Sequence, residues 1–323
     1  MENKHIVLMY SKSHCDIAVP FVTKKQEAYM IKLFEYGKSQ GVMYYRSGLD
    51  QIDLATAIFK KVWSLNNQGK WEIVLDIKAS AILDHTTPSQ KIFEDYVLMT
   101  TVDGVVPVCN QSHFRRNLGN KLTQYILFNQ FMSPTYFLNS KKQLQEVAKK
   151  DTNGVYVKKP LYGQLGNGVS KGIIKDFLQD DTLEYPFVLQ KFINSTINIK
   201  GTNVNGFADL RLTFINNELI YALSRVAAVG SFITNLDKGG HAEAVNLEQI
   251  PSDALEIANK VKQQLSIFKT STYCIDFLFE NGKAYIVEMN TRPSTELLYK
   301  SGNMEAVKRS IIATTNQCLN LIS

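Results

Sequence analysis

Short apolar runs alternate with longer amphipathic runs over the first hundred residues of this 323-residue chain. The runs cover residues 5–10, 24–38, 54–65 and 71–77. This rhythm is typical of a βαβ unit, in which a helix covers a buried strand, and it predicts an open, largely parallel α/β domain. No Gly-x-Gly-x-x-Gly motif follows the first run, so the sequence does not indicate a dinucleotide-binding version of this domain.

The composition is that of a globular protein with an ordinary core. Hydrophobic residues make up 45% of the chain and charged residues 20%, which excludes long-range disorder, and the length allows two or three compact units. Subtracting 30 acidic from 36 basic residues leaves a net charge of +6, which favours anionic ligands without requiring nucleic acid as a partner. The four cysteines are widely separated, and no apolar run approaches the ~18 residues of a membrane span. We therefore expect a cytoplasmic protein in a reducing compartment, without a nucleic-acid or membrane partner.

The pattern changes near residue 112, where we place a boundary. Beyond it we expect two helices and four strands. The helices cover residues 114–131 and 254–268, and the strands cover 155–157, 187–190, 210–214 and 218–225. The last two strands would form a hairpin that turns at Asn216-Asn217. The second part of the chain is therefore predicted to contain antiparallel sheet.

A glycine-rich segment follows the strand expected at residues 155–157. It begins with Lys158-Lys159 and contains Gly163, Gly166 and Gly168. Glycines at this spacing suit a flexible loop whose amide groups close over phosphate oxygens, with lysine as the countercharge. A hairpin turn with solvated lysines would have the same sequence. The Gly-Lys-Ser/Thr signature of a phosphate loop that opens a helix is missing.

Oxygen-bearing side chains gather near the C-terminus. Asp276, Glu288 and Asn290 offer the hard ligands that Mg²⁺ prefers, especially where substrate phosphates complete the coordination. The alternative is a hairpin with a solvated edge carboxylate, although Glu288 interrupts an apolar strand and is costly to bury unpaired.

The connection between these strands makes the metal hypothesis testable. A two-residue turn at Asn281-Gly282 would pair Asp276 with Val287 and send Asp276 and Glu288 to opposite faces of the sheet. The metal hypothesis therefore requires an odd-length connection. A loop of three residues with Gly282 in a left-handed bulge position would restore the shared face.

Two arginines form a third candidate site. Arg211, in the segment Asp209-Leu-Arg211, and Arg225 lie on the two adjacent strands predicted above. Guanidinium groups above an anion site can clamp phosphoryl oxygens or a substrate carboxylate, because their fork matches either geometry. Surface ion pairs would give the same sequence pattern.

Together and in this order, the three sites closely resemble those of the ATP-grasp superfamily, and within it the RimK and glutathione-synthetase-like carboxylate–amine ligases. Residues 157–160 with the glycines that follow resemble the phosphate-loop strand and lid of that family. Residues 119–122, ahead of residues 133–135, resemble its Asp-Lys…Pro-Thr segment. Residues 225–240 are similar to its Arg…Asn-Leu-x-x-Gly-Gly element, and residues 276–290 match its metal triad. The resemblance covers roughly residues 113–305.

The resemblance implies an α/β N-terminal domain with an open, mostly parallel sheet, followed by a two-subdomain α+β ATP-grasp fold. Residues 1–112 would be the N-terminal domain, residues 113–190 the ATP-grasp N-terminal subdomain with its lid, and residues 191–323 the C-terminal subdomain with the metal site. A nucleotide would lie between the two subdomains, and the N-terminal domain would contribute to the acceptor side.

The resemblance also implies roles for individual residues, with ATP and one or two Mg²⁺ ions as cofactors and Mn²⁺ as an alternative metal. The catalytic residues would be Arg225 and Arg211, the metal ligands Asp276, Glu288 and Asn290, and the ATP-binding residues Lys121, Lys159, Gly163, Gly166, Gly168, Gln190, Lys191, Phe192, Ile193 and Asn235. Two positions depart from the family pattern. Gln190 stands where many relatives have an acidic residue, and Asn120 stands where Asp is common before the lysine.

The activity implied by the resemblance is ATP-dependent formation of an amide bond between a carboxylate and an amine through an acyl phosphate, with release of ADP and phosphate. The substrates would be amino acids, other small molecules or peptides. A small-molecule kinase with the same fold, and a nucleotide-binding assembly protein without turnover, are the alternatives. Homo-oligomers are common among the proteins it resembles. The substrates themselves are not indicated, because the first 112 residues and residues 194–205 carry no charge pattern that names them.

Overall fold

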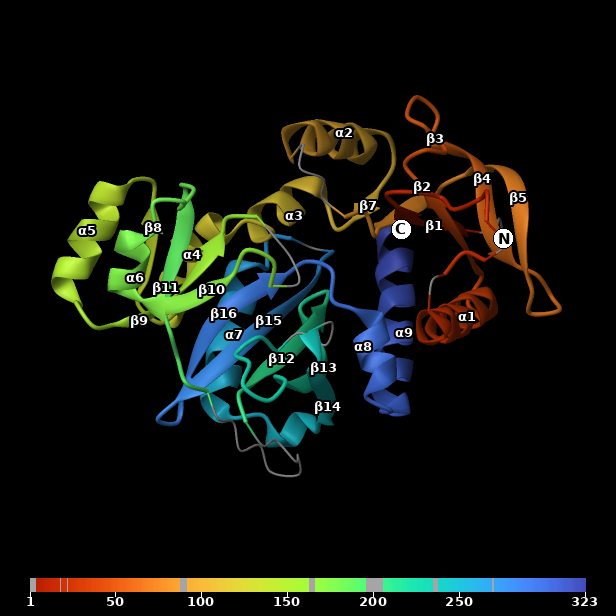
Figure 1. Cartoon of the computed structure of the whole chain (residues 1–323). Coiled ribbons are helices and arrows are strands. Elements are labelled where there is room, and N and C mark those ends of the chain that lie inside the picture. Colours follow the sequence, from red (N-terminus) through yellow and green to blue (C-terminus); the bar gives the residue numbers. More distant parts are fainter. Residues whose placement is uncertain are drawn as a thin grey trace.

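Three β-sheets form the framework of the molecule (Figure 1). A seven-stranded sheet comes from the N-terminal part of the chain, a four-stranded sheet from the middle and a five-stranded sheet from the C-terminal part. The structure is a computed structural model, and it describes residues 4–17, 19–21, 23–87, 92–162, 166–195, 206–234, 238–268 and 270–323. None of the helices in these ranges is long and apolar enough to span a membrane.

The seven-stranded sheet has a parallel and an antiparallel half. Its strands are β1 (Lys4–Tyr10), β2 (Val42–Gly48), β3 (Ile52–Asp53), β4 (Ile58–Leu65), β5 (Trp71–Lys78), β6 (Ala81–Asp84) and β7 (Val108–Cys109), accompanied by helices α1 (Lys24–Ser39) and α2 (Ile92–Val105). Strands β2, β1, β6 and β7 are parallel and adjacent in this order. Strands β3, β4 and β5 pair antiparallel beyond β2. The predicted open α/β sheet is therefore confirmed.

The antiparallel half differs from the sequence prediction. Residues 54–65 and 71–77 do not continue the βαβ rhythm but belong to the β4–β5 hairpin. The connection between them is a tight turn in which Asn66 N–H donates to the Lys70 carbonyl at 2.9 Å. A parallel pair needs a crossover of a dozen or more residues, so this short connection allows only antiparallel pairing.

The order of the parallel strands creates a point where the chain changes direction across the sheet. From β1 the chain passes through α1 to β2 on one side, whereas β6 lies on the other side of β1. In open α/β sheets, ligands bind outside the carboxyl ends of the strands at such a point. The carboxyl ends of β1 and β6, at Tyr10 and Asp84, are therefore positions where substrate binding is expected.

The four-stranded sheet has the order β10-β9-β11-β8. Its strands are β8 (Thr135–Leu138), β9 (Val155–Pro160), β10 (Ser170–Ile173) and β11 (Phe187–Lys191), and helices α5 (Lys141–Lys150) and α6 (Ile174–Gln179) pack beside them. The helix predicted at residues 114–131 is divided into α3 (Ser112–Leu118), α4 (Lys121–Phe128) and the 3₁₀ turn η1 (Asn129–Phe131). The break occurs because Asn120 is extended and its side chain accepts a hydrogen bond from Leu122 N–H, which begins a new helix.

The five-stranded sheet is antiparallel throughout, in the order β14-β13-β12-β15-β16. It contains β12 (Ala208–Ile215), β13 (Glu218–Val226), β14 (His241–Val245), β15 (Thr272–Glu280) and β16 (Lys283–Asn290), with η3 (Leu247–Gln249) and α7 (Ser252–Gln264). The predicted hairpin at Asn216-Asn217 is confirmed, since both residues have the positive φ of a tight hairpin turn. Helix α7 buries Ala254, Ala258 and Val261 in the core of this sheet, as the apolar spacing predicts.

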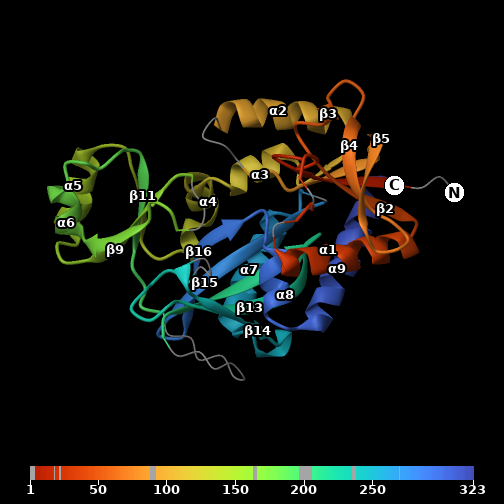
Figure 2. The same ribbon diagram turned by 45° about the vertical axis from the view of Figure 1, so that its right-hand side comes forward.

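The C-terminal helices return the chain to the N-terminal sheet (Figures 1 and 2). After β16 come α8 (Thr295–Lys300) and α9 (Met304–Leu321). One apolar cluster joins Ile6 of β1 and Leu33 of α1 with Leu223 of β13 and Ile311 of α9. The hydroxyl groups of Tyr29 and Ser310 also form a buried hydrogen bond of 2.9 Å. Helix α9 therefore contributes to a core shared by the N-terminal and C-terminal sheets.

This shared core predicts a large effect of shortening a side chain in α9. Replacing Ile311, which is 5% exposed, by alanine should lower the free energy of unfolding by about 2–5 kcal/mol. The exposed Asn316 on the same helix is the matched control, and Asn316→Ala should change it by less than about 0.5 kcal/mol. Urea unfolding measures both values. Equal effects of the two substitutions would contradict the packing of α9.

Candidate active site

A row of charged side chains crosses one face of the five-stranded sheet. Asp209 on β12 lies opposite Arg225 on β13, and Arg211 on β12 lies opposite Asp276 on β15. Glu288 on β16 lies opposite Asp276 on its other side. Directly opposed residues of an antiparallel pair point to the same face, as do residues two apart on one strand. The sheet thus gathers the predicted arginines and carboxylates into one row.

A β-bulge produces the pairing of Asp276 with Glu288. The turn at Asn281-Gly282 has two residues, because Glu280 pairs directly with Lys283. The three-residue connection predicted from the sequence is therefore wrong. The register instead shifts between Asp276 and Phe277, which leaves Val287 as the extra residue of β16. This bulge resets the side-chain alternation, so the shared face that the metal hypothesis requires is present.

Short, buried ion pairs connect the side chains of the charged row. Arg211 donates from Nε to Oδ1 and from Nη2 to Oδ2 of Asp276, both at 2.7 Å. Arg225 donates from Nη2 to Asp276 Oδ2 at 2.7 Å and from Nε to Asp209 Oδ1 at 2.8 Å. Burial by itself raises the pKa of Asp276, but the two guanidinium groups outweigh it and hold the pKa below its usual value. The carboxylate therefore stays ionised in the interior.

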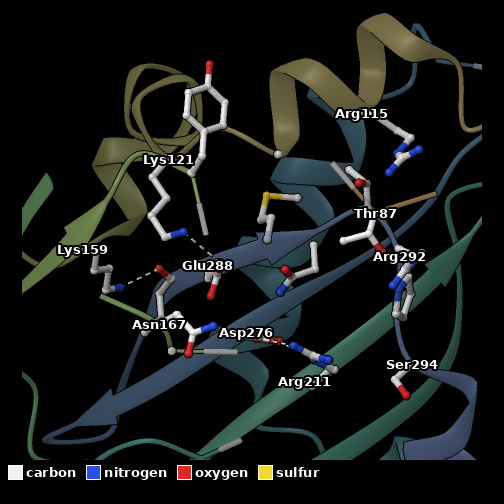
Figure 3. Close-up of a pocket in the computed structure, with 18 of the residues that line it drawn as sticks. Thr87, Arg115, Lys121, Lys159, Asn167, Arg211, Asp276, Glu288, Arg292 and Ser294 are labelled. Atoms are coloured by element: carbon white, nitrogen blue, oxygen red, sulfur yellow. Dashed lines mark hydrogen bonds and ion pairs between the residues drawn. The ribbon is translucent and has the colours of Figure 1, made fainter. Parts of the chain in front are cut away.

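Two lysines from outside the five-stranded sheet face this row, as Figure 3 shows. Lys121, the first residue of α4, places Nζ 3.3 Å from Glu288 Oε1. Lys159 on β9 donates from Nζ to Gln190 Oε1 at 2.6 Å and to the Val287 carbonyl at 3.1 Å. Burial lowers the pKa of Lys159 to about 8, which Glu288 partly opposes. Gln190, one of the two predicted departures from the family pattern, thus holds this ammonium with a neutral oxygen.

Several of the other predicted ATP-binding residues lie around the same site. Lys191 is the last residue of β11, and Phe192 and Ile193 follow it, with the Phe192 ring stacked 5.8 Å from Phe207. The Lys191 ammonium is 3.2 Å from Asp151. Gly166 and Gly168 have positive φ, which favours glycine there. Gly163 and Asn235 lie outside the described residues, so their predicted roles remain predictions.

Most of these residues, although not Gly168, line one cavity of about 1260 Å³ between the three sheets. This exceeds the ~300–1,000 Å³ of a usual small-molecule site, so there is room for a second ligand beside a nucleotide. Of the predicted residues, the cavity wall includes Lys121, Lys159, Gly166, Gln190, Lys191, Phe192, Ile193, Arg211, Arg225, Asp276, Glu288 and Asn290.

Residues from the N-terminal part of the chain line the far end of the cavity. None of these residues was predicted from the sequence. The wall at this end includes Tyr10 at the end of β1, His85 and Thr87 just after β6, and Arg115 on α3. The signal was present in the sequence, because residues 84–87 are the first polar residues after a buried run. To interpret this signal as part of a binding site, one needs the strand order, which places β6 beside β1.

The donor set fits a hard divalent cation. Asp276 accepts three hydrogen bonds from the arginines, and a carboxylate has about four acceptor sites, so one remains. Glu288 and Asn290 add oxygens on the same face. Within the described ranges, no cluster of three or more histidine, cysteine, aspartate or glutamate side chains can hold a metal alone. A cation at this site would therefore also need Asn290 and ligand oxygens, which is typical of Mg²⁺ bound with phosphates.

A buried amide side chain positions the strand that carries these ligands. Strand β16 is at the edge of its sheet, and Gln124 of α4 pairs with the open side of Met289. Gln124 Oε1 accepts from Met289 N–H at 2.9 Å, and its Nε2 donates to the Met289 carbonyl at 2.9 Å. Met289 lies between Glu288 and Asn290, so this clamp fixes the backbone of both.

Gln124→Leu should therefore destabilise the protein and loosen this edge. The substitution leaves a buried N–H and a buried carbonyl without partners, which costs about 1–3 kcal/mol for each group. Urea unfolding gives the total, and faster hydrogen exchange at the Met289 amide locates the effect. The exposed Gln130 supplies the control Gln130→Leu. Unchanged exchange at Met289 would contradict the clamp.

Comparison with known proteins agrees with this geometry. A family model described as the RimK-like ATP-grasp domain matches residues 122–314. The chain is 33% identical over 106 residues to coenzyme gamma-F420-2:alpha-L-glutamate ligase of Methanococcus maripaludis, covering 33% of this chain and 34% of that protein. It is 25% identical over 174 residues to a probable alpha-L-glutamate ligase of Saccharophagus degradans, covering 53% of this chain and 54% of that protein. The chain thus spans between a third and about half of the length of these curated relatives.

The fold is also that of solved ATP-grasp enzymes. The crystal structure of D-cycloserine synthetase DcsG superposes with a TM-score of 0.64 at 14% identity, over 97% of this chain and 99% of that one. At this identity the likeness shows the fold alone. The family model, however, covers more than half of the chain. It begins just after Lys121 and contains Lys159 together with the arginine and carboxylate positions described above. This chain belongs to the RimK-like ATP-grasp family.

Proposed function

We propose that this chain is an ATP-dependent ligase that joins a carboxylate to an amine through an acyl phosphate, releasing ADP and phosphate. The observation that carries the proposal is the placement of two lysines opposite the charged row of the C-terminal sheet, in a cavity that continues to the strand ends of the N-terminal sheet. The match to the RimK-like ATP-grasp domain and the ligase names of the relatives support it.

In this proposal the nucleotide lies between the four-stranded and five-stranded sheets. Lys121 and Lys159 contact its phosphates, and the lid around Gly166 and Gly168 covers them. Gln190 and the backbone of residues 191–193 line the adenine pocket. Lys159 is suited to this role because its ammonium already lies at the floor of the cavity, held by two neutral oxygens.

Asp276, Glu288 and Asn290 would hold Mg²⁺, which when bound offsets phosphate charge and polarises the transferred phosphoryl group. The Lys121–Glu288 pair supports this assignment, since the lysine compensates the carboxylate in the absence of a cation. Arg211 and Arg225 use Nε and Nη2 for the aspartates, and no described residue accepts from Nη1 of either. These Nη1 groups are thus placed to donate to developing negative charge.

The reaction then needs two displacements. A substrate carboxylate oxygen forms a bond to the γ-phosphorus as the bond to the ADP oxygen breaks. The amine next attacks the acyl carbon, phosphate leaves, and the amine loses a proton. Arg225 stabilises the oxyanion of the tetrahedral intermediate, and the lid excludes water that would hydrolyse the acyl phosphate.

Each part of the site is assigned to one of the proposed domains. Residues 1–112 would form the substrate side, residues 113–190 the lid subdomain and residues 191–323 the metal subdomain. The substrates are amino acids, other small molecules or peptides in this proposal. All four cysteines are free thiols, which supports a reducing location such as the cytoplasm.

An assay with mixed pools of carboxylates and amines tests the function. ADP and phosphate should be released only when both pools are present, and Glu288→Gln or Asp276→Asn should lower the rate about a hundredfold or more. Glu280→Gln, an exposed carboxylate on the same hairpin, is the matched control and should keep the wild-type rate. A stable phosphorylated product without phosphate release would identify a kinase instead.

The lowered pKa of Lys159 predicts a pH dependence of nucleotide affinity. The ammonium form binds phosphate, and about half of this form is lost in the unliganded protein at a pH of about 8. ADP affinity should therefore fall as the pH rises from 7 to 9, with proton uptake on binding. Calorimetry in two buffers of different ionisation enthalpy measures that uptake. Lys159→Arg keeps the charge at every pH and should lose the uptake; equal uptake in both proteins would refute the assignment.

A further inference from the structure

Lys121 contacts one of the three proposed metal ligands from outside the sheet that carries them (Figure 3). Its Nζ lies 3.3 Å from Glu288 Oε1, and its side chain is only 10% exposed. The backbone at this position is fixed, because Lys121 N–H donates to the Leu161 carbonyl at 3.2 Å and the Asn120 side chain caps α4. The start of α4 thus places the ammonium on Glu288.

The described charged groups on this floor of the cavity have no net negative charge that would attract a metal ion. Three carboxylates and four cationic side chains meet there, namely Asp209, Asp276 and Glu288 with Lys121, Lys159, Arg211 and Arg225. The two arginines balance the two aspartates, and Lys121 balances Glu288. Lys159 then adds further positive charge. A divalent ion added to this set would therefore bind against the charge of the site.

The Lys121 ammonium and a metal ion compete for Glu288. An ion bound to that carboxylate would lie close to the ammonium, and the two cations would repel each other strongly where water is largely excluded. Lysine carries a point charge on a flexible stem, whereas Arg211 and Arg225 are each fixed on an aspartate through two nitrogens. Lys159 is held by two neutral oxygens. Of these four cations, Lys121 is therefore the one that has to move before Glu288 can bind an ion.

We propose that Lys121 takes the place of the metal ion on Glu288 in the nucleotide-free chain, and that the phosphate oxygens of the nucleotide draw the ammonium away. This inference rests on the proposed function, because it describes the regulation of the same ATP site. Glu288 is then released when phosphate oxygens arrive to complete the coordination of the ion. The exchange links the two binding events, so the chain takes up a metal ion together with the nucleotide and not ahead of it.

Metal binding without turnover tests the proposal. The probe is Mn²⁺, whose free concentration is measured by electron paramagnetic resonance in the presence of the full chain, without nucleotide. Lys121→Met frees Glu288 and should bind Mn²⁺ about tenfold more tightly than the wild type, or better, because a repelling charge is removed. The same variant should bind ADP about ten- to a hundredfold more weakly in calorimetry without metal, because a charged contact to phosphate is lost. Damage to the fold would not produce these opposite effects.

Three further variants define the site. Lys300 also lines the cavity and pairs with Glu296 at 2.7 Å, so Lys300→Met frees a carboxylate in the same way and is the matched control. It should bind Mn²⁺ as the wild type does. Lys121→Arg keeps a positive charge beside Glu288 and should keep the Mn²⁺ affinity low. Lys121→Met combined with Glu288→Gln should lose the gain in Mn²⁺ affinity, because the carboxylate that binds the ion is removed.

Equal Mn²⁺ affinity in the wild type and Lys121→Met, an equal gain in Lys300→Met, or wild-type ADP affinity in Lys121→Met would each overturn the inference. The melting temperature shows whether each variant is folded, and Lys121→Gln replaces Lys121→Met in the comparison if the latter is not. Opposite effects of the Lys121 substitution on Mn²⁺ and ADP, without ADP release from any substrate pair, would refute the proposed ligase and leave the exchange standing.

Discussion

The buried pairing of Arg211 and Arg225 with Asp276 and Asp209 is the interaction on which the site depends. Two carboxylates and two guanidinium groups lie in the interior, where a single unpaired charge would be very costly. Because the positive and negative charges compensate each other, the centre of the sheet can hold charged side chains. It also fixes each side chain, because every guanidinium uses two nitrogens on carboxylates. The chemistry of the cavity is therefore built on the rigid part of the fold.

The edge strand β16 shows how a local irregularity serves that arrangement. A regular ladder from the Asn281-Gly282 turn would place Glu288 on the face away from Asp276. The extra residue, Val287, corrects the alternation, and its carbonyl accepts a hydrogen bond from Lys159. Farther along, the Asn110 side chain donates to the carbonyls of Thr272 and Thr291, at 2.6 and 2.7 Å. A bulge and buried amides thus fix a strand that lies at the edge of its sheet.

Most of the elements that carry the site could be predicted from the sequence, because their signals are local. Asn216-Asn217 defines a tight turn, the apolar spacing of α7 defines its buried face, and residue types identify the charged row. The bulge at Val287 could not be predicted, because only the pairing of two strands reveals it. The antiparallel β4–β5 hairpin has apolar runs much like those of a βαβ unit. The place of Arg292 on the cavity wall could not be predicted either, because it depends on contacts with His85 and Thr87, which are more than two hundred residues away in sequence.

Helix α9 joins segments of the fold that are far apart in the sequence. It fills space between β1, α1 and the five-stranded sheet, so that these segments stabilise one another. Because synthesis proceeds from the N-terminal side, α9 leaves the ribosome well after β1 and α1, and until then the apolar face made by Ile6 and Leu33 lacks this covering. Completion of the core beside the N-terminal sheet therefore has to wait until the segments between α1 and α9 have been translated.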